Sequence, residues 1–191
     1  MSFYDDPENI KKYIQMCENY DGSNIYQSLS KSLPEKSTLL ELGSGAGLDI
    51  ENLKNNYSVT GSDLSEEFLN ICRDKYPEVP FLKLNALQLE VSEKYNCIFS
   101  NKVLHHLTEK ELKQSLDQQA KILSTNGLIA HSFWLGKEDK EMYGLLFTYY
   151  NKGHLLSIIS KSFEVLSTLS YKELEDDDSL FVIAKIKSNQ I

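Results

Sequence analysis

The stretch from Leu39 to Gly47 constrains the fold more than any other part of the sequence. It reads Leu-Leu-Glu-Leu-Gly-Ser-Gly-Ala-Gly, so a short apolar run passes directly into glycines at alternate positions. Glycine adopts positive φ angles readily and lets a ligand approach the main chain closely. A helix after such a turn presents N–H groups and a partial positive charge. The segment therefore predicts a buried strand, a ligand-binding turn and a helix over about 47–55.

Strand-like and helix-like patterns alternate along the rest of the chain. Ser65 and Thr108 are expected helix N-caps, and Glu111 has the capping-box spacing to Thr108. This alternation is typical of an α/β sheet with helices on both faces. The other expected helices are two within 6–32 and those at about 65–75, 108–123 and 152–160. The expected strands are 38–42, 57–61, 79–84, 97–100, 128–133, 163–169 and 179–187, with the last two as an antiparallel pair.

Composition excludes several classes of protein. The formal net charge is −8, from 20 basic and 28 acidic residues, so the chain repels nucleic-acid phosphates unless it has a basic patch, and the sequence contains none. Its apolar runs are far shorter than the roughly 20 residues of a membrane span. Cys17, Cys72 and Cys97 are too scattered for a disulfide framework or a zinc site. With an acidic N-terminus that lacks a signal pattern, these features predict a cytoplasmic protein without nucleic-acid or membrane partners.

Spacing around the glycines indicates which ligand the turn holds. A dinucleotide-binding turn has the pattern Gly-x-Gly-x-x-Gly/Ala, and here its last position is Leu48, which is too bulky for close packing of helix on strand. Asp63 lies 20 residues after Gly43, at the expected end of the second strand. A carboxylate there can accept hydrogen bonds from both hydroxyls of a ribose. These residues favour another nucleoside ligand. The alternatives are a purely structural turn and, for Asp63, a carboxylate that serves the following helix.

With these motifs the chain resembles the class I S-adenosylmethionine-dependent methyltransferases over most of its length. Residues 41–47 are similar to that family's first motif, and residues 99–107 to its fourth, which lies beside the transferred methyl group. Asn85 stands where the family usually has Asp, but an amide still offers a donor and an acceptor to an adenine edge. The resemblance implies S-adenosyl-L-methionine as the cofactor. The residues that it assigns to cofactor binding are Tyr20, Glu41, Gly43, Ser44, Gly45, Gly47, Asp63, Leu64, Asn85, Ala86, Leu87, Asn101, Lys102 and Val103.

The same resemblance implies a Rossmann-like, seven-stranded, mostly parallel sheet with helices on both faces, an antiparallel C-terminal hairpin and an N-terminal helical lid. Because no linker or repeat divides the sequence, we expect a single domain over 1–191. Its parts are the lid (1–33), a cofactor-binding core (37–135) and a substrate-side part (136–191). The segments 3–7 and 20–22 are the expected cover of the cofactor. Tyr4, Tyr13 and Tyr20 are the candidate closing residues, with helix packing as the alternative for Tyr13.

The pair His105-His106 is a candidate for metal or acid–base chemistry. No His-Glu-x-x-His motif surrounds it, and no cysteine or third histidine lies near in sequence, so we expect no metal. Imidazole titrates near neutral pH, which makes His106 the candidate catalytic residue, as a proton acceptor or a substrate-orienting group. Packing of the strand-to-helix turn is the alternative. Residues 131–134 and 147–150 are expected either to form an aromatic wall for the acceptor or to belong to the core.

These observations predict an S-adenosylmethionine-dependent methyltransferase that acts on a small molecule, because the expected domain is compact, acidic and without a basic face. Ligands should lie at the carboxyl ends of the parallel strands. One alternative is a non-catalytic module that binds S-adenosylmethionine or S-adenosylhomocysteine and acts through a protein partner. Another is a nicotinamide-dependent oxidoreductase, which Leu48 disfavours. A protein acceptor, the acceptor atom and the oligomeric state stay open.

Overall fold

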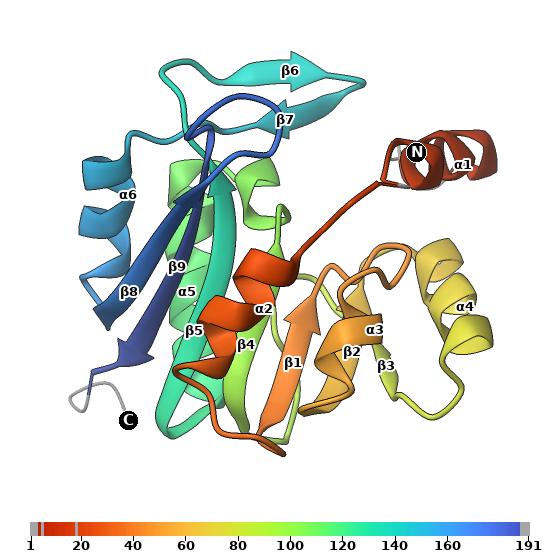
Figure 1. Ribbon diagram of the computed structural model, residues 1–191, viewed down its shortest axis with the longest axis horizontal. Coiled ribbons are helices and arrows are strands. Elements are labelled where there is room, and N and C mark those ends of the chain that lie inside the picture. Colours follow the sequence, from red (N-terminus) through yellow and green to blue (C-terminus); the bar gives the residue numbers. More distant parts are fainter. Residues whose placement is uncertain (1–3, 5, 18, 188–191) are drawn as a thin grey trace.

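A computed structural model describes residue 4, residues 6–17 and residues 19–187. The strands in these residues are β1 (Thr38–Leu42), β2 (Ser58–Asp63), β3 (Phe81–Lys83), β4 (Tyr95–Asn101), β5 (Leu123–Trp134), β6 (Lys140–Met142), β7 (Leu145–Phe147), β8 (Phe163–Tyr171) and β9 (Ser179–Ile186). Seven of them form one sheet in the order β3-β2-β1-β4-β5-β9-β8, and β6 and β7 form a separate hairpin (Figure 1).

The sheet is mostly parallel and reverses direction at one edge. β1 pairs in parallel with β2 and β4, β2 with β3, and β4 with β5. β9 lies between β5 and β8 and is antiparallel to both. The predicted Rossmann-like sheet with an antiparallel C-terminal pair is therefore confirmed. The strand order switches between β1 and β4, and ligands bind open α/β sheets at such a switch point.

Helices begin where the sequence supplies caps. The Asp6 side chain accepts a hydrogen bond from Glu8 N, and Ser65 caps the next long helix. Thr108 and Glu111 form the expected capping box. In the described part of the chain, no helix has the length and apolarity that crossing a membrane requires. The helices are α1 (Pro7–Met16), α2 (Ser23–Ser30), α3 (Ile50–Leu53), α4 (Glu66–Lys75), α5 (Glu109–Ile122) and α6 (Lys152–Ile159), with a 3₁₀ turn, η2 (Leu104–His106).

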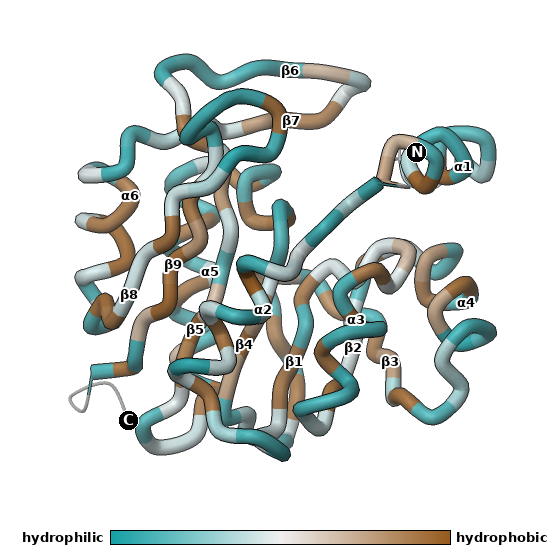
Figure 2. Tube along the Cα trace, in the orientation of Figure 1, coloured by the Kyte–Doolittle hydropathy of each residue, from teal (hydrophilic) through white to brown (hydrophobic). Residues whose placement is uncertain are grey.

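Successive side chains of the central strands point to opposite faces of the sheet, so the hydrophobic core is divided between the two faces. Leu39 and Phe99 belong to one buried cluster, to which α2 and α3 contribute. Leu40 and Ile98, their chain neighbours, belong to the other cluster, with residues of α5 and α6. Successive side chains of a strand point to opposite faces, so strands covered on both faces are apolar throughout. Figure 2 shows hydrophobic residues along these strands and on the helix faces turned toward them.

The helix after the glycines is shorter than predicted. We expected it over about 47–55, whereas α3 spans only Ile50–Leu53. Gly47 has φ of +72°, which a right-handed helix does not admit. Its N–H instead bonds to the Ser44 carbonyl. The glycines therefore extend the turn at the expense of the helix.

Sequence analysis missed the β6–β7 hairpin altogether. Its two connecting residues, Tyr143 and Gly144, have φ of +57° and +72°. Two successive positive φ angles are the geometry of a type I′ turn, which matches the twist of hairpin strands. Each strand has three residues, too few to show a two-residue hydrophobic period.

Beyond the carboxyl ends of the parallel strands lie α1, on the side of α4, and the β6–β7 hairpin, on the side of β9 (Figure 1). Ile10 of α1 is buried against Ala46 of the glycine turn and Phe68 of α4. Thr148 N–H, just after β7, donates to the His105 carbonyl of η2 at 2.8 Å. Segments distant in sequence thus enclose the edge at which a ligand was expected.

Candidate cofactor and acceptor site

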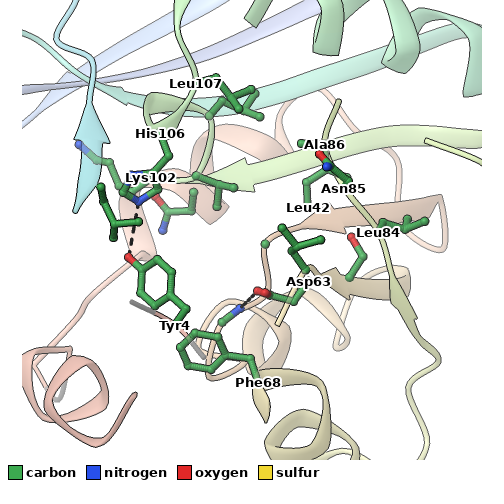
Figure 3. A pocket seen from close by; sticks show the side chains of 18 of the residues that line it. Tyr4, Leu42, Asp63, Phe68, Leu84, Asn85, Ala86, Lys102, His106 and Leu107 are labelled. Carbon is green, nitrogen blue, oxygen red and sulfur yellow. Dashed lines mark hydrogen bonds between the residues drawn. The ribbon is translucent and has the colours of Figure 1, made fainter. Parts of the chain in front are cut away.

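Two adjoining cavities lie at this edge of the sheet. The first, which we call the Asp63 cavity, has a volume of ≈ 230 Å³. The second, which we call the His105 cavity, has a volume of ≈ 250 Å³. Gly43, Asn101, Lys102 and His106 line both. Figure 3 shows the Asp63 cavity, with the side chains of Tyr4, Asp63, Asn85 and His106 around it.

The glycine loop, residues 43–47, forms one wall. Gly43, Gly45 and Gly47 all have positive φ, of +69°, +50° and +72°. A Cβ on Gly43 would lie 2.6 Å from a methyl carbon of Val103, so the loop packs directly on the end of β4. At Gly45 the nearest side chain is Tyr13 of α1, 3.6 Å from the position of a Cβ. The loop therefore exposes bare main chain toward the cavity, as a nucleoside cofactor requires.

Asp63 at the end of β2 is fixed by the loop itself. Its Oδ2 accepts a hydrogen bond from Gly45 N–H, and its Oδ1 accepts one from Ser65 N–H, each at 2.9 Å. Burial raises the pKa of this carboxyl, and the hydrogen bonds from Ser65 and Gly45 oppose the rise. Leu64 also contributes a main-chain hydrogen bond to this carboxyl. A carboxylate has about four lone-pair positions, so these bonds leave acceptor capacity for a ligand. Asp63 thus supports the start of α4 and also faces the cavity. The two alternatives that the sequence left open, a ligand-binding carboxylate and a carboxylate that serves the next helix, are compatible in this position.

Asn85 and Leu64 lie at the rim of the Asp63 cavity. Asn85 Oδ1 accepts a hydrogen bond from Leu87 N–H at 2.9 Å, which leaves Nδ2 as the amide atom with hydrogens to donate. Leu64 is 60% exposed, a high value for a leucine beside a cavity, and its apolar surface is suited to a flat base. Ala86 lines the same cavity.

Three predicted cofactor residues do not line either cavity, namely Glu41, Gly47 and Leu87. Glu41 is 1% exposed, and its Oε2 has no hydrogen-bond partner among the described residues. Burial raises the pKa of Glu41 well above its ordinary value, and nearby Asp49 adds to the rise. Gly47 packs beneath Tyr76, whose hydroxyl donates to the Gly47 carbonyl at 3.0 Å.

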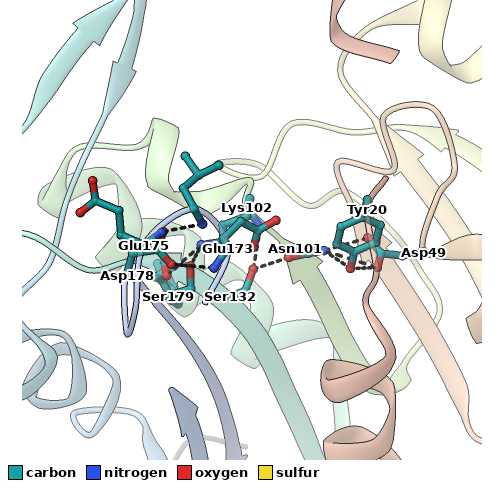
Figure 4. A network of polar contacts seen from close by, with 11 residues as sticks. Tyr20, Asp49, Asn101, Lys102, Ser132, Glu173, Glu175, Asp178 and Ser179 are labelled. Atoms are coloured by element: carbon teal, nitrogen blue, oxygen red, sulfur yellow. Dashed lines mark hydrogen bonds and ion pairs between the residues drawn. The ribbon is translucent and has the colours of Figure 1, made fainter. Parts of the chain in front are cut away.

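Tyr20 lies in the His105 cavity rather than the Asp63 cavity. Its hydroxyl donates to Asp49 Oδ1 at 2.8 Å and accepts from Asn101 Nδ2 at 2.6 Å. Tyr26 also donates to Asp49 Oδ1, at 2.7 Å. Asn101 Oδ1 in turn accepts from the Ser132 hydroxyl, so the contacts run from α2 across the ends of β4 and β5 (Figure 4).

His106 lies between the two cavities in a defined tautomer. Its Nδ1 is 2.7 Å from the Leu146 carbonyl, and because a carbonyl only accepts, Nδ1 carries the hydrogen. Nε2 therefore has the lone pair and lies 3.5 Å from the Tyr4 hydroxyl. Burial lowers the pKa of His106, and the bond to Leu146 only partly offsets this. The imidazole is therefore neutral at pH 7 and able to accept a proton at Nε2.

The two aromatic segments divide between cavity and core. Trp134 and Phe147 line the His105 cavity. His131 is fully buried between Ser100 and Gln119, with ring-nitrogen contacts of 2.8 and 2.7 Å, so it belongs to the core. Tyr150 is 3% exposed and is also in the core. Phe3 and Asp5 of the expected cover lie outside the described residues, whereas Tyr4 and Tyr13 line both cavities.

Comparison with known proteins agrees with this geometry. Residues 39–127, which contain the glycine loop and Asp63, match a family model described as a methyltransferase domain. The matched segment is therefore similar to a methyltransferase domain, and it contains the strands and turns that line the Asp63 cavity. No curated protein matches the chain by sequence.

Solved methyltransferase structures share the fold over nearly the whole chain. N-methyltransferase NodS from Bradyrhizobium japonicum WM9, in complex with S-adenosyl-L-homocysteine, is 14% identical with a TM-score of 0.78, covering 97% of this chain and 99% of that one. A Burkholderia thailandensis 1,6-didemethyltoxoflavin-N1-methyltransferase is 15% identical with a TM-score of 0.79, covering 93% and 83%. A TehB-like methyltransferase from Corynebacterium glutamicum is 17% identical with a TM-score of 0.76, covering 95% and 100%. At such identities the likeness establishes the fold.

Sequence reasoning missed three polar residues that line the His105 cavity, namely Asp49, His105 as a cavity residue, and Glu173. Asp49 lies two residues after the glycine loop, a position that would have suggested it. Glu173 belongs to the acidic run between β8 and β9 and carries no local signal that distinguishes it from its neighbours. Among the described residues, no group of three or more His, Cys, Asp or Glu side chains is placed to hold a metal ion.

Proposed function

We propose that this protein binds S-adenosyl-L-methionine in the Asp63 cavity and transfers its methyl group to a small molecule in the His105 cavity. The observation that carries the proposal is the hydrogen bond from Gly45 N–H to Asp63 on the wall of a cavity that Asn85 and Leu64 also line. Bare main chain, a carboxylate, an amide and an apolar rim together suit a nucleoside. The S-adenosyl-L-homocysteine complex of the similar NodS structure supports the same ligand.

Four residues of the Asp63 cavity have direct roles toward the cofactor in this proposal. The bound cofactor would supply an electrophilic methyl group on a sulfonium, so the hard chemistry is its own. Asp63 accepts hydrogen bonds from the ribose hydroxyls, and Asn85 Nδ2 donates to the adenine edge. Leu64 and Ala86 cover the base. The chain's remaining task is to hold the acceptor in line with the methyl group, and such positioning is worth roughly 7–11 kcal/mol.

His106 is the proposed catalytic residue because it lines both cavities. Its neutral Nε2 accepts a proton from an acceptor group that must lose one before or during attack. The Leu146 carbonyl holds the ring in the tautomer that this role needs. Tyr4 approaches Nε2 from the N-terminal segment, so the segment that covers the cavity also contacts the proposed base.

The parts of the chain correspond to steps of the reaction. Residues 1–33 act as the lid, because Tyr4 and Tyr13 line the Asp63 cavity and α1 packs on the glycine loop. Residues 37–135 hold the cofactor, and residues 136–191 shape the acceptor side through Leu145, Phe147 and Glu173. Covering the site excludes water, which strengthens every electrostatic interaction within it.

A small-molecule acceptor is favoured by the size of the His105 cavity and by the net charge of −8. The toxoflavin-precursor methyltransferase among the similar structures has a small-molecule acceptor in its name. A ring-sized cavity covered by α1 and the β6–β7 hairpin leaves little room for an extended polypeptide.

The experiment is methyl transfer from S-adenosyl-L-methionine with a labelled methyl group to a panel of small metabolites, with release of S-adenosyl-L-homocysteine as the readout. We expect turnover with at least one acceptor and a large loss of turnover in His106→Asn at unchanged S-adenosyl-L-homocysteine affinity. Tight binding of the cofactor without turnover on any metabolite or protein fraction would instead indicate the non-catalytic binding module.

A further inference from the structure

The His105 cavity has two kinds of wall. Trp134, Phe147 and the His105 ring form an aromatic side, with the ring centroids of His105 and Phe147 5.1 Å apart. Met16 of α1 and the residue that caps it, Cys17, also line the cavity. Flat, apolar surfaces of this kind are suited to a planar ring rather than to a sugar or a short acid.

Two buried polar groups in this cavity have no hydrogen-bond partner among the described residues. Oε2 of Glu173 is buried, and no described residue makes a hydrogen bond to it. His105 is 2% exposed, and neither of its ring nitrogens has a partner within the described part of the chain. A buried polar group left unpaired costs about 1–3 kcal/mol. Such groups in a cavity call for a ligand that pairs with them.

Lys102 forms an ion pair with Glu173 but no hydrogen bond. Its Nζ donates to the Ser179 hydroxyl at 2.6 Å and to the Phe133 carbonyl at 3.3 Å. It also lies 3.4 Å from the centroid of the Trp134 ring. Glu173 Oε2 is 3.9 Å away, beyond hydrogen-bond length. The ammonium therefore gives its hydrogen bonds to other groups, and Glu173 Oε2 stays ion-paired with Lys102 while keeping its capacity to accept a hydrogen bond (Figure 4).

The loop that carries Glu173 is ordered by its own hydrogen bonds. Asp178 accepts from the main-chain N–H groups of Glu173, Leu174 and Glu175, at 2.8–2.9 Å. The Asp178 carboxylate also accepts from the Ser179 hydroxyl, at 2.7 Å. Because the loop is held in place before any ligand arrives, Glu173 binds without paying the entropy of ordering it.

Charge in the cavity selects against an anionic ligand. Among the described lining residues, the charged side chains are the carboxylates of Asp49 and Glu173 and the ammonium of Lys102. Burial raises the pKa of Glu173, and Lys102 partly offsets the rise. Burial also lowers the pKa of Lys102 to about 7. A cation that pairs with Glu173 would favour the ionised carboxylate, and aromatic faces attract cations as well.

We propose that the methyl acceptor is an amine carried beside a planar ring, that Glu173 binds its nitrogen, and that the ring lies against Phe147 and His105. The inference rests on the proposed function, since it assigns the acceptor of that same site. An alcohol or thiol could donate a hydrogen bond to Glu173 Oε2, but it would not balance the excess negative charge of Asp49 and Glu173 over Lys102. A carboxylic acid would add to that negative charge.

The chemistry balances with residues already described. The amine enters as an ammonium and loses one proton to Nε2 of His106. Its lone pair then forms the N–CH₃ bond, while the electron pair of the breaking S–CH₃ bond stays on sulfur as a neutral thioether. The product nitrogen carries the positive charge, which Glu173 again matches.

The test measures ligand binding by calorimetry to the protein saturated with S-adenosyl-L-homocysteine. The probes are benzylamine, phenethylamine and tryptamine, compared with benzyl alcohol, 2-phenylethanol and 3-phenylpropionate. We expect at least one ring amine to bind about tenfold or more tightly than its alcohol partner, the value of a hydrogen bond to a charged group. Glu173→Gln should remove that preference. Glu175→Gln, which removes the same charge from an exposed position of the same loop, should retain it.

The outcomes separate the two proposals. If S-adenosyl-L-homocysteine binds but amines and alcohols bind alike, or if Glu173→Gln behaves as Glu175→Gln does, the amine inference is overturned and the proposed function stands. If S-adenosyl-L-homocysteine does not bind the wild-type protein, both fail. Thermal unfolding of each variant, with Glu173→Asp as a second substitution, distinguishes loss of the amine site from loss of the fold.

Discussion

At the scale of single residues, Asp63 joins the glycine loop to the Asp63 cavity. Its two oxygens already accept hydrogen bonds from Gly45 and Ser65. The carboxylate is therefore pre-oriented, and a ligand that adds further hydrogen bonds does not have to order it first.

Replacing Asp63 with Ala should weaken S-adenosyl-L-homocysteine binding by about 1–3 kcal/mol, roughly 5- to 150-fold in Kd, because a charge-assisted bond to the ribose is lost. Calorimetry measures the change. Glu67→Ala is the matched control, since Glu67 is an exposed carboxylate in the first turn of α4. Equal Kd values for the Asp63 variant and the control, with both folded, would remove the ribose role.

His106 makes a prediction about pH. Burial lowers its pKa below the ordinary 6.5, and a base acts only in its deprotonated form. We therefore expect kcat/KM to have an acid limb, which falls at pH values below 6.5 as Nε2 is protonated. In His106→Asn, which keeps an N–H donor toward Leu146, the residual rate should lose this acid limb. The exposed His154→Asn is the control. An acid limb that persists unchanged in His106→Asn would rule out the base assignment.

The positions of the candidate residues were predictable from sequence where a motif fixed the spacing, whereas their roles stay predictions. The glycines and Asp63 are placed by the chain itself, so the Asp63 cavity was foreseen. Glu173 and Asp49 were not, because their approach to Lys102 and Asn101 depends on loops that meet only in the folded protein. Nothing in the local sequence distinguishes Glu173 from Glu175, yet one lines a cavity and the other faces solvent.

At the scale of elements, β5 is tied to α5 by a buried polar chain. His131 Nε2 donates to Gln119 Oε1, and the Ser100 hydroxyl donates to His131 Nδ1. The neutral ring thereby satisfies both nitrogens inside the apolar core. A protonated ring would leave Nδ1–H facing a hydroxyl and place a charge in that core.

Burial lowers the pKa of His131 to about 3, whereas the unfolded value is about 6.5. Between these values the unfolded chain binds a proton that the folded chain does not, so stability falls as pH falls. Relative to His131→Gln, the wild type should lose unfolding free energy from pH 6.5 toward pH 3, by at most about 1.4 kcal/mol per unit. Denaturant titrations at several pH values measure the difference. Parallel pH curves would contradict the buried neutral state.

The β6–β7 hairpin should act on the acceptor more than on the cofactor. Gly144 has φ of +72°, and nothing lies within 4 Å of the position of its Cβ, so Gly144→Ala adds only the left-handed backbone cost of about 1–2 kcal/mol. We expect a raised KM for the acceptor, with a smaller change in S-adenosyl-L-homocysteine Kd. Gly153→Ala, in the first turn of α6, is the control. A larger effect on the cofactor than on the acceptor would contradict this division.

Element boundaries followed from sequence where caps were present and failed where φ is positive. Ser65 and Thr108 marked their helices correctly. The short α3 and the hairpin turn at Tyr143 both depend on residues with positive φ. Tyrosine rarely adopts positive φ, so the local sequence does not predict a turn at Tyr143. Propensity and period are weak guides to three-residue strands.

At the scale of the whole molecule, the sheet order places every proposed ligand contact at one edge. β1, β2, β4 and β5 run in parallel, so their carboxyl ends present the glycine loop, Asp63, Asn101 and Trp134 together. α1 and the β6–β7 hairpin, which are more than 120 residues apart in sequence, both lie beside that edge. The alternation of elements predicted this architecture from the sequence because each parallel connection needs a crossover. The His105 cavity could not be predicted from sequence, because its lining residues are brought together only by contacts between segments that are distant in the chain.

Calorimetry of the wild-type protein with S-adenosyl-L-homocysteine and, separately, with NADH tests the central claim most directly. Binding of one S-adenosyl-L-homocysteine per chain, with no heat from NADH, is the result that the account predicts. NADH binding, or silence toward the thioether nucleoside from a folded protein, would contradict it.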